Sequence, residues 1–307
     1  MTSQIVLFAQ SRSGSHLLER MISKQQPDVK PLYNPLGPSR GIQLGWLRSE
    51  TFADGMQQDK MSEFEASTHD AVAEWEGELS RAPSEGRKLI IHTHPFNPAK
   101  PSRMLHYVKL LETRPQPPLP PEGENFTLLP DTLLLREGTV PIINIRDPRL
   151  VVPSAYRVLD SFGLPHGGGR PNFLIATCPI WARLLYDWYI SHGVHPLVAD
   201  ADDFMTSEDF VRRICSRAGL DPALACFAWE ELTPDEKAKL HPMYYKSQKT
   251  LVDSCRVRVE LAGRNLNLEE LKGEWEEKFG EDMRLVREMV DLSVPHYEYL
   301  YERRMKL

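Results

Sequence analysis

The chain has 307 residues, with 37 Lys or Arg against 43 Asp or Glu and a formal net charge of −6. This mildly acidic balance creates no global positive field that would gather nucleic acid or an anionic membrane. Hydrophobic residues make up 41% and charged residues 26% of the chain, which is typical of folded globular proteins and excludes bulk disorder.

The four cysteines are widely spaced and form no C-x-x-C pair: Cys178, Cys215, Cys226 and Cys255. In a chain of this length, such spacing favours reduced cytoplasmic thiols over a disulfide framework or a zinc site. No apolar run approaches the roughly 20 residues that span a bilayer. Residues 1–4 also lack the basic start of a signal peptide. We therefore expect a cytoplasmic protein that needs no metal.

The first expected element is a strand at residues 5–9, where five consecutive apolar residues suit burial on both faces of a parallel sheet. A polar loop follows at residues 10–15. Residues 16–22 repeat apolar side chains at i, i+4, as in a helix that packs one face on the sheet. Residues 27–60 are rich in Pro, Gly and polar residues, so a mixture of loops and short helices is expected there.

Further along, apolar runs predict three more short strands, at residues 88–91, 140–145 and 195–199. Helical spacing predicts helices at residues 62–79, from 148 to about 159, at 180–190, from a Ser207 cap to Gly219, and at about 268–292. Residues 115–121 are rich in proline and residues 166–169 in glycine, so both are expected to be loops. This alternation indicates a single α/β domain over residues 1–307 with a mainly parallel sheet and a helical C-terminal part from about residue 222.

The loop after the first strand has the features of a phosphate-binding turn. Backbone N–H groups at a helix N-terminus attract phosphate, and Gly14 lets the backbone approach closely. Ser13 and Ser15 add hydroxyls, and Arg12 adds a forked cation. The G-x-x-x-x-G-K-[ST] pattern is not met, because Ala9 holds its first glycine position. A magnesium-dependent ATPase or GTPase is therefore disfavoured, although the loop viewed alone could also be an ordinary serine-rich turn.

A second strand-to-helix junction carries Arg146 at the end of a strand and Ser154 about two turns into the following helix. Ligands of open α/β sheets bind at the carboxyl ends of the strands. Two such junctions on one sheet therefore suggest a ligand with phosphates at two separated points.

The pairing of S-R-S-G-S (residues 11–15) with R-D-P-x-x-x-x-x-S-x-Y (residues 146–156) resembles the sulfotransferases that use 3′-phosphoadenosine 5′-phosphosulfate (PAPS). The resemblance implies a P-loop NTPase-like fold, a three-layer sandwich around the sheet. It also implies that Arg146 and Ser154 bind the 3′-phosphate of PAPS. The residues implied to bind the 5′-phosphosulfate are Arg12, Ser13, Gly14, Ser15 and His16, with Arg12 also stabilising charge during transfer.

The sequence H-T-H-P at residues 92–95 resembles the K-T-H-x-P of the same family, whose histidine is the general base. The match implies that His94 takes the acceptor proton, while His92 takes the place of the family's lysine. The acidic group Asp200, Asp202 and Asp203 follows another predicted strand, and we interpret it as structural rather than metal-binding.

The resemblance implies a sulfotransferase that moves a sulfuryl group from PAPS to a hydroxyl of a small-molecule acceptor without a metal. From the charge and the lack of long apolar runs we expect neither nucleic-acid nor membrane partners. The family's R-K-G motif is absent, and residues 263–265 replace it poorly. An alternative is therefore a repurposed enzyme that performs acid/base chemistry on a metabolite, such as elimination, isomerisation or cyclisation. An inactive binding protein is the third reading. The sequence determines neither the acceptor nor the oligomeric state.

Overall fold

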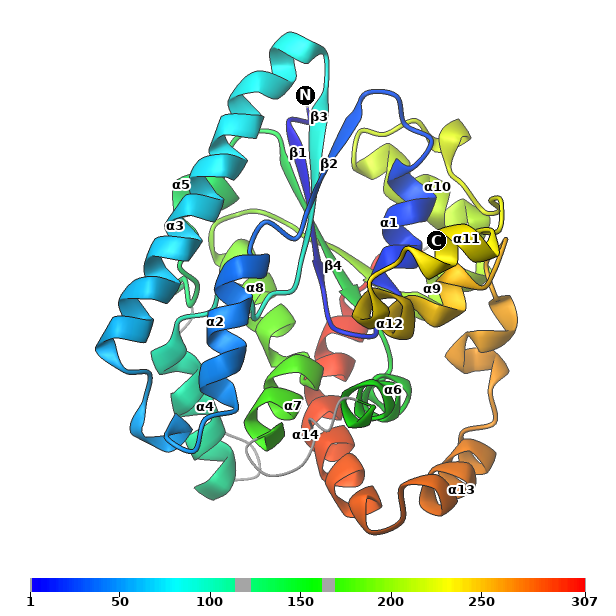
Figure 1. The fold of residues 1–307 in the computed structure, drawn as a ribbon. Helices are drawn as coiled ribbons and strands as arrows, with labels where there is room; N and C mark the ends of the chain where they lie inside the picture. Colours follow the sequence, from blue (N-terminus) through cyan, green and yellow to red (C-terminus); the bar gives the residue numbers. More distant parts are fainter. Residues whose placement is uncertain (1, 114–122, 162–168, 307) are drawn as a thin grey trace.

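The computed structural model describes residues 2–113, 123–161 and 169–306, which form layers of helices around a central sheet (Figure 1). Within them, five strands pair in the order β2-β3-β1-β4-β5, and every neighbouring pair is parallel. The strands are β1 (Gln4–Ala9), β2 (Val29–Tyr33), β3 (Lys88–Thr93), β4 (Thr139–Ile145) and β5 (Leu197–Asp200). The predicted α/β class and parallel sheet are confirmed.

Helices cover both faces of this sheet. In the described residues the α-helices are α1 (Ser15–Ser23), α2 (Gly37–Leu47), α3 (Gln58–Arg81), α4 (Pro101–Thr113), α5 (Asp131–Leu134), α6 (Pro148–Asp160), α7 (Gly169–Thr177), α8 (Ile180–Ser191), α9 (Ala201–Thr206), α10 (Glu208–Arg217), α11 (Pro234–Ala238), α12 (Pro242–Val252), α13 (Leu268–Phe279) and α14 (Met283–Glu302).

Strand β1 contributes to the core on both of its faces. Ile5 and Leu7 pack with the apolar side chains of α1 and α10, whereas Val6 and Phe8 pack with those of α3, α8 and α14. Figure 1 shows α1 and α10 on one side of the sheet and α2 and α3 on the other. Because successive side chains of a strand point to opposite faces, a five-residue apolar run is what a doubly covered central strand requires.

Residues 27–60 were expected to contain only loops and short helices. Helix α2 agrees with this expectation, but β2 shows that the segment also contains a strand. The strand contains Pro31, and its side chains are partly buried or, at Pro31 and Tyr33, exposed. It pairs with β3 alone and so forms an edge of the sheet, where proline is tolerated because no second ladder needs its N–H. Helices α4 and α7 were also not predicted.

The C-terminal helix expected at residues 268–292 is two helices. They separate at Gly280, whose φ of 51° lies in the left-handed region. The tyrosines at 297, 299 and 301 lie inside α14. The predicted Ser207 cap is confirmed, because its side chain accepts a hydrogen bond from the backbone N–H of Phe210.

Two predicted loops fall mainly outside the described residues: the proline-rich segment 115–121 entirely, and residues 166–168 of the glycine-rich one. Among the helices that the structure does describe, none combines the length and the apolar composition that a bilayer crossing requires.

Candidate functional site

A cavity of about 660 Å³ opens at the carboxyl ends of the strands. Strands β1 and β4 are direct neighbours in the sheet, and they lead into α1 and α6 respectively. The two junctions singled out in the sequence therefore face the same space. Most of the predicted site residues line this cavity: Arg12, Gly14, Ser15, His16, His94, Arg146 and Ser154.

Arg12 joins the two junctions. Its Nε donates to Oγ of Ser154 on α6 at 3.1 Å, and its guanidinium also donates to the carbonyl of Ser247 on α12. Burial, with smaller contributions from Arg146 and Arg157, lowers the pKa of Arg12 to about 10. Arg12 is thus still charged at neutral pH, in a place where a bound anion would relieve the repulsion between neighbouring cations.

Gly14 and Ser13 have different roles in the turn. Gly14 caps α1 with a φ of 79°, and a Cβ there would lie 3.4 Å from the Phe204 ring. The Ser13 hydroxyl is buried and donates to the carbonyl of Gln10 at 2.6 Å, besides its contact with Asn144. Ser13 is not among the residues that line the cavity. The Ser13 side chain holds the loop against β4. The neighbouring residues of the turn, and not Ser13, line the cavity.

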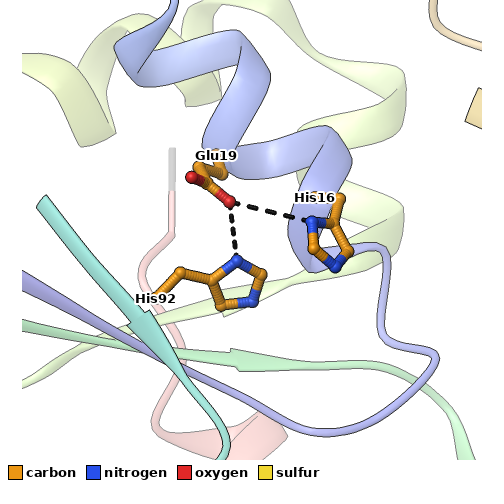
Figure 2. A group of neighbouring side chains, drawn as sticks. All are labelled: His16, Glu19 and His92. Atoms are coloured by element: carbon orange, nitrogen blue, oxygen red, sulfur yellow. Dashed lines mark hydrogen bonds and ion pairs between the residues drawn. The ribbon is translucent and has the colours of Figure 1, made fainter. Parts of the chain in front are cut away.

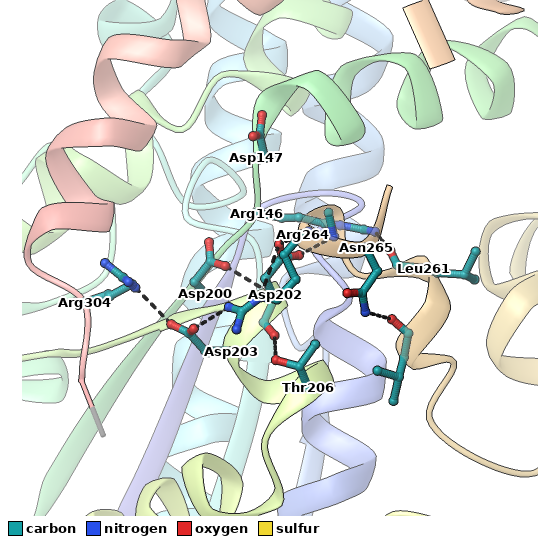
Figure 3. A network of polar contacts seen from close by, with 12 residues as sticks. Arg146, Asp147, Asp200, Asp202, Asp203, Thr206, Leu261, Arg264, Asn265 and Arg304 are labelled. Atoms are coloured by element: carbon teal, nitrogen blue, oxygen red, sulfur yellow. Dashed lines mark hydrogen bonds and ion pairs between the residues drawn. The ribbon is translucent and has the colours of Figure 1, made fainter. Parts of the chain in front are cut away.

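Arg146 lies where β4 ends, against the C-terminal segment (Figure 3). Its Nη2 donates to the carbonyl of Leu261 at 2.8 Å, while its buried Nε has no hydrogen-bond partner among the described residues. Burial lowers the pKa of this guanidinium in spite of nearby carboxylates. Arg146 therefore keeps unused hydrogen-bonding capacity at the cavity.

The acidic group beside Arg146 is occupied by structural contacts. The Asp202 carboxylate accepts the backbone N–H groups of Gly263 at 2.6 Å and Arg264 at 2.7 Å, which ties residues 263–265 to the start of α9. Asp203 forms ion pairs with Arg264 and Arg304 (Figure 3). These contacts support the structural interpretation of the acidic group.

The cavity wall carries an excess of positive charge. Beyond the predicted Arg12 and Arg146, four further cations line it, opposed there by the carboxylate of Glu274: Arg157, Arg256, Arg258 and Lys278. Three of them follow residue 250 in the chain. Sequence reasoning missed the three residues after position 250 because no motif surrounds them, and only the folding of the C-terminal part brings them to the cavity. Arg157, in contrast, lies on α6 directly after the motif at residues 146–156.

His94 lies just past β3, and its ring stacks on Phe96 with centroids 5.2 Å apart. Its Nδ1 bonds the Ala9 carbonyl. A carbonyl only accepts, so Nδ1 carries the proton and Nε2 is the free lone pair of the neutral ring. Burial, assisted by His92 and Arg40, lowers the pKa of His94 to about 4. At neutral pH, His94 is therefore an uncharged proton acceptor.

His92 points toward α1. Its Nδ1 lies 2.6 Å from Oε2 of Glu19, and its ring centroid lies 4.7 Å from that of His16 in the first turn of α1 (Figure 2). Burial, with His92, His94 and Arg12 nearby, lowers the pKa of His16 to about 3. His92 itself is not among the cavity-lining residues. Glu19 was not predicted, although its i, i+3 spacing from His16 was a readable signal.

No family model matches the sequence. The chain is similar to sulfotransferase ppzF of Metarhizium majus (strain ARSEF 297), with 29% identity over 195 residues. It is also similar to sulfotransferase ppzF of Metarhizium rileyi (strain RCEF 4871), with 28% identity over the same length. Each alignment covers 59% of this chain and spans 57% of the relative.

Proposed function

We propose that this protein is a sulfotransferase that uses PAPS as donor and a hydroxyl group of a small molecule as acceptor. The observation that carries the proposal is the meeting of the two strand–helix junctions. Arg12 after β1 donates to Ser154 on α6, and both residues line one cavity together with Arg146. The two curated relatives named sulfotransferase support the same reaction class.

The residues present fit a nucleotide with two separated anionic ends. The cavity volume, about 660 Å³, lies within the range of roughly 300–1,000 Å³ common for small-molecule sites. The turn at Arg12, Gly14 and Ser15 would hold the 5′-phosphosulfate. Arg146, with its unpartnered Nε, and Ser154 would hold the 3′-phosphate. No metal ion is required for these contacts.

When bound, PAPS supplies an activated sulfuryl group. His94 accepts the proton of the acceptor hydroxyl at Nε2, because Nδ1 is held by the Ala9 carbonyl. Arg12 offsets the negative charge that develops on the oxygens of the leaving phosphate. The positions of Arg12 and His94 on the wall of the same cavity allow both tasks at one bound acceptor.

Calorimetry with the product nucleotide, 3′,5′-ADP, tests the donor half of the proposal. We expect saturable binding to the full chain, weakened by added salt because the contacts are charged. Incubation with PAPS and a panel of phenols, alcohols and sterols, followed by mass spectrometry for a sulfuryl mass increase, tests the acceptor half. Absence of nucleotide binding at millimolar concentration would refute PAPS use.

A further inference from the structure

Three side chains from two elements converge beside the cavity. His16 and Glu19 belong to consecutive turns of α1, and His92 belongs to β3. One ligand atom from each lies within 4.8 Å of the other two. The Oε2 atom of Glu19 lies 2.6 Å from Nδ1 of His92 and 3.8 Å from Nδ1 of His16 (Figure 2). Two imidazole nitrogens therefore face one carboxylate oxygen.

These separations are close to those of a metal site. With zinc–ligand bonds of about 2.0–2.1 Å, the ligand atoms of a tetrahedral ion are about 3.4 Å apart. The two observed distances bracket that value, so a small rotation of the Glu19 carboxylate would bring its oxygen to comparable distances from both imidazole nitrogens. The hydrogen bond from His92 to Glu19 already holds two of the three ligands close together.

The surroundings also suit a bound ion. The Tyr33 hydroxyl lies 3.1 Å from Nε2 of His16, on the ring nitrogen opposite the cluster. Metal-binding histidines usually have such a partner, which fixes the tautomer and the ring orientation. His92 is only 4% exposed, whereas His16 lines the cavity, so an ion and a fourth ligand can enter from that side.

We propose that His16, Glu19 and His92 bind one divalent transition-metal ion, with zinc as the first choice and a fourth coordination position open to the cavity. Two imidazoles and a carboxylate with one open position form a ligand set typical of catalytic zinc sites. The proposal departs from the sequence-based expectation that the protein needs no metal. The proposed metal site is independent of sulfuryl transfer, and its test uses neither nucleotide nor acceptor.

The test is calorimetric titration of the chelator-treated full chain with Zn²⁺, with Co²⁺ absorption as a second probe. We expect one ion per chain and a visible Co²⁺ spectrum of low coordination number. His16→Gln and Glu19→Gln should each weaken binding by more than about 100-fold, because loss of an outer partner alone costs 10–100-fold. Tyr33→Phe should weaken it by about 10-fold. Zn²⁺ should raise the melting temperature of the wild type but not of His16→Gln.

The matched control is His69→Gln, which removes an exposed imidazole from α3 and should leave zinc affinity unchanged. Circular dichroism without metal checks that each variant is folded. If Glu19→Gln does not fold, His16→Gln decides the question, since His16 lines the cavity and Glu19 does not. Zinc that binds equally well to His16→Gln and to the wild type would overturn the proposal, and the exposed thiol of Cys255 would then be the first alternative ligand to test.

Discussion

His94 and His92 are two residues apart, but the structure gives them different partners. The Nδ1 of His94 bonds the backbone of β1, whereas the Nδ1 of His92 bonds a carboxylate of α1. Their rings, 6.2 Å apart between centroids, are therefore not interchangeable. A histidine base needs a neutral ring with a free lone pair, and the contact with the Ala9 carbonyl provides this for His94.

The first prediction concerns the pH dependence of activity. Because His94 acts as a base when neutral and its pKa is lowered to about 4, activity should be nearly constant around neutral pH and fall in acid through an ionisation near 4. The measurement is kcat/KM against pH with PAPS and an acceptor from the screen. An acid limb near the ordinary histidine value of about 6.5 would contradict the assignment.

Replacing the base itself separates catalysis from binding. His94→Ala should lower turnover by about 100-fold or more, the usual scale for loss of an acid–base group. The affinity for 3′,5′-ADP should change little, because the cations that hold it are on other loops. Turnover assays and calorimetry on the same preparation check both halves. Near-full turnover of His94→Ala would assign the base elsewhere.

Arg146 is expected to bind the nucleotide and to take no direct part in the chemical step. Arg146→Ala should weaken 3′,5′-ADP binding by about 10- to 100-fold, because a hydrogen bond to a charged group contributes about 1.5–3 kcal/mol. Arg149→Ala is the matched control. Its side chain lies three residues away, pairs with Asp147 and does not line the cavity. Calorimetry should find equal affinity for Arg149→Ala and wild type, and an equal loss in both variants would argue against a specific 3′-phosphate contact.

At the scale of the elements, the junction between β1 and α1 depends on the backbone conformation of Gly14. An alanine there would adopt a left-handed φ and bring its Cβ against the Phe204 ring. We expect Gly14→Ala to reduce the free energy of unfolding by about 1–2 kcal/mol and to weaken nucleotide binding, since the turn must shift. Urea unfolding and calorimetry measure the two effects.

The control for that prediction is Gly45→Ala within α2. A Cβ at position 45 meets no atom within 4 Å, and the position is helical. Because alanine is the better helix former, Gly45→Ala should stabilise the protein by roughly 0.5–1 kcal/mol. Equal destabilisation by both substitutions would show that the conformation of Gly14 is not the cause.

At the scale of the whole molecule, buried histidines make folding sensitive to acid. Burial lowers the pKa of His16 to about 3 and of His94 and His296 to about 4. These rings stay neutral in the native state, while the unfolded chain protonates them below about 6.5. The stabilisation that these neutral histidines contribute is therefore fully present above about pH 6.5 and is lost as the pH falls toward 4. Burial raises the pKa of Asp200 to about 7, so the native state binds a proton that the unfolded chain lacks. Asp200 therefore favours folding more strongly as the pH falls.

Three histidines against one aspartate leave a net excess of two protons on the unfolded chain. The free energy of unfolding should therefore fall by on the order of 2–3 kcal/mol per pH unit between about pH 6 and 5. Urea unfolding at several pH values measures the slope. His296→Gln, on α14 and outside the cavity, should flatten it by about half. A stability that rises on acidification would contradict the burial of these histidines in neutral form.

Local signals were sufficient for much of the fold. Runs that are apolar on both faces predicted β1 and β4, helical spacing predicted α3 and α8, and the Ser207 cap predicted the start of α10. Strand β2 was missed because Pro31 and its exposed positions carry no such pattern. Its place was decided by pairing with the edge of β3, which is a tertiary property.

The sequence by itself determined the chemistry available at the site, since the turn around Gly14, the junction at Arg146 and the histidines of residues 92–94 are each local motifs. Only the tertiary structure decided which of them meet. The strand order β3-β1-β4 brings three carboxyl ends to one edge, and α1, which follows β1, packs on one face of the sheet next to it. Glu19 reaches His92, and the cations after residue 250 reach the cavity, because packing brings together residues that are far apart in the chain. Such contacts depend on the burial of whole elements, and no short stretch of sequence encodes them.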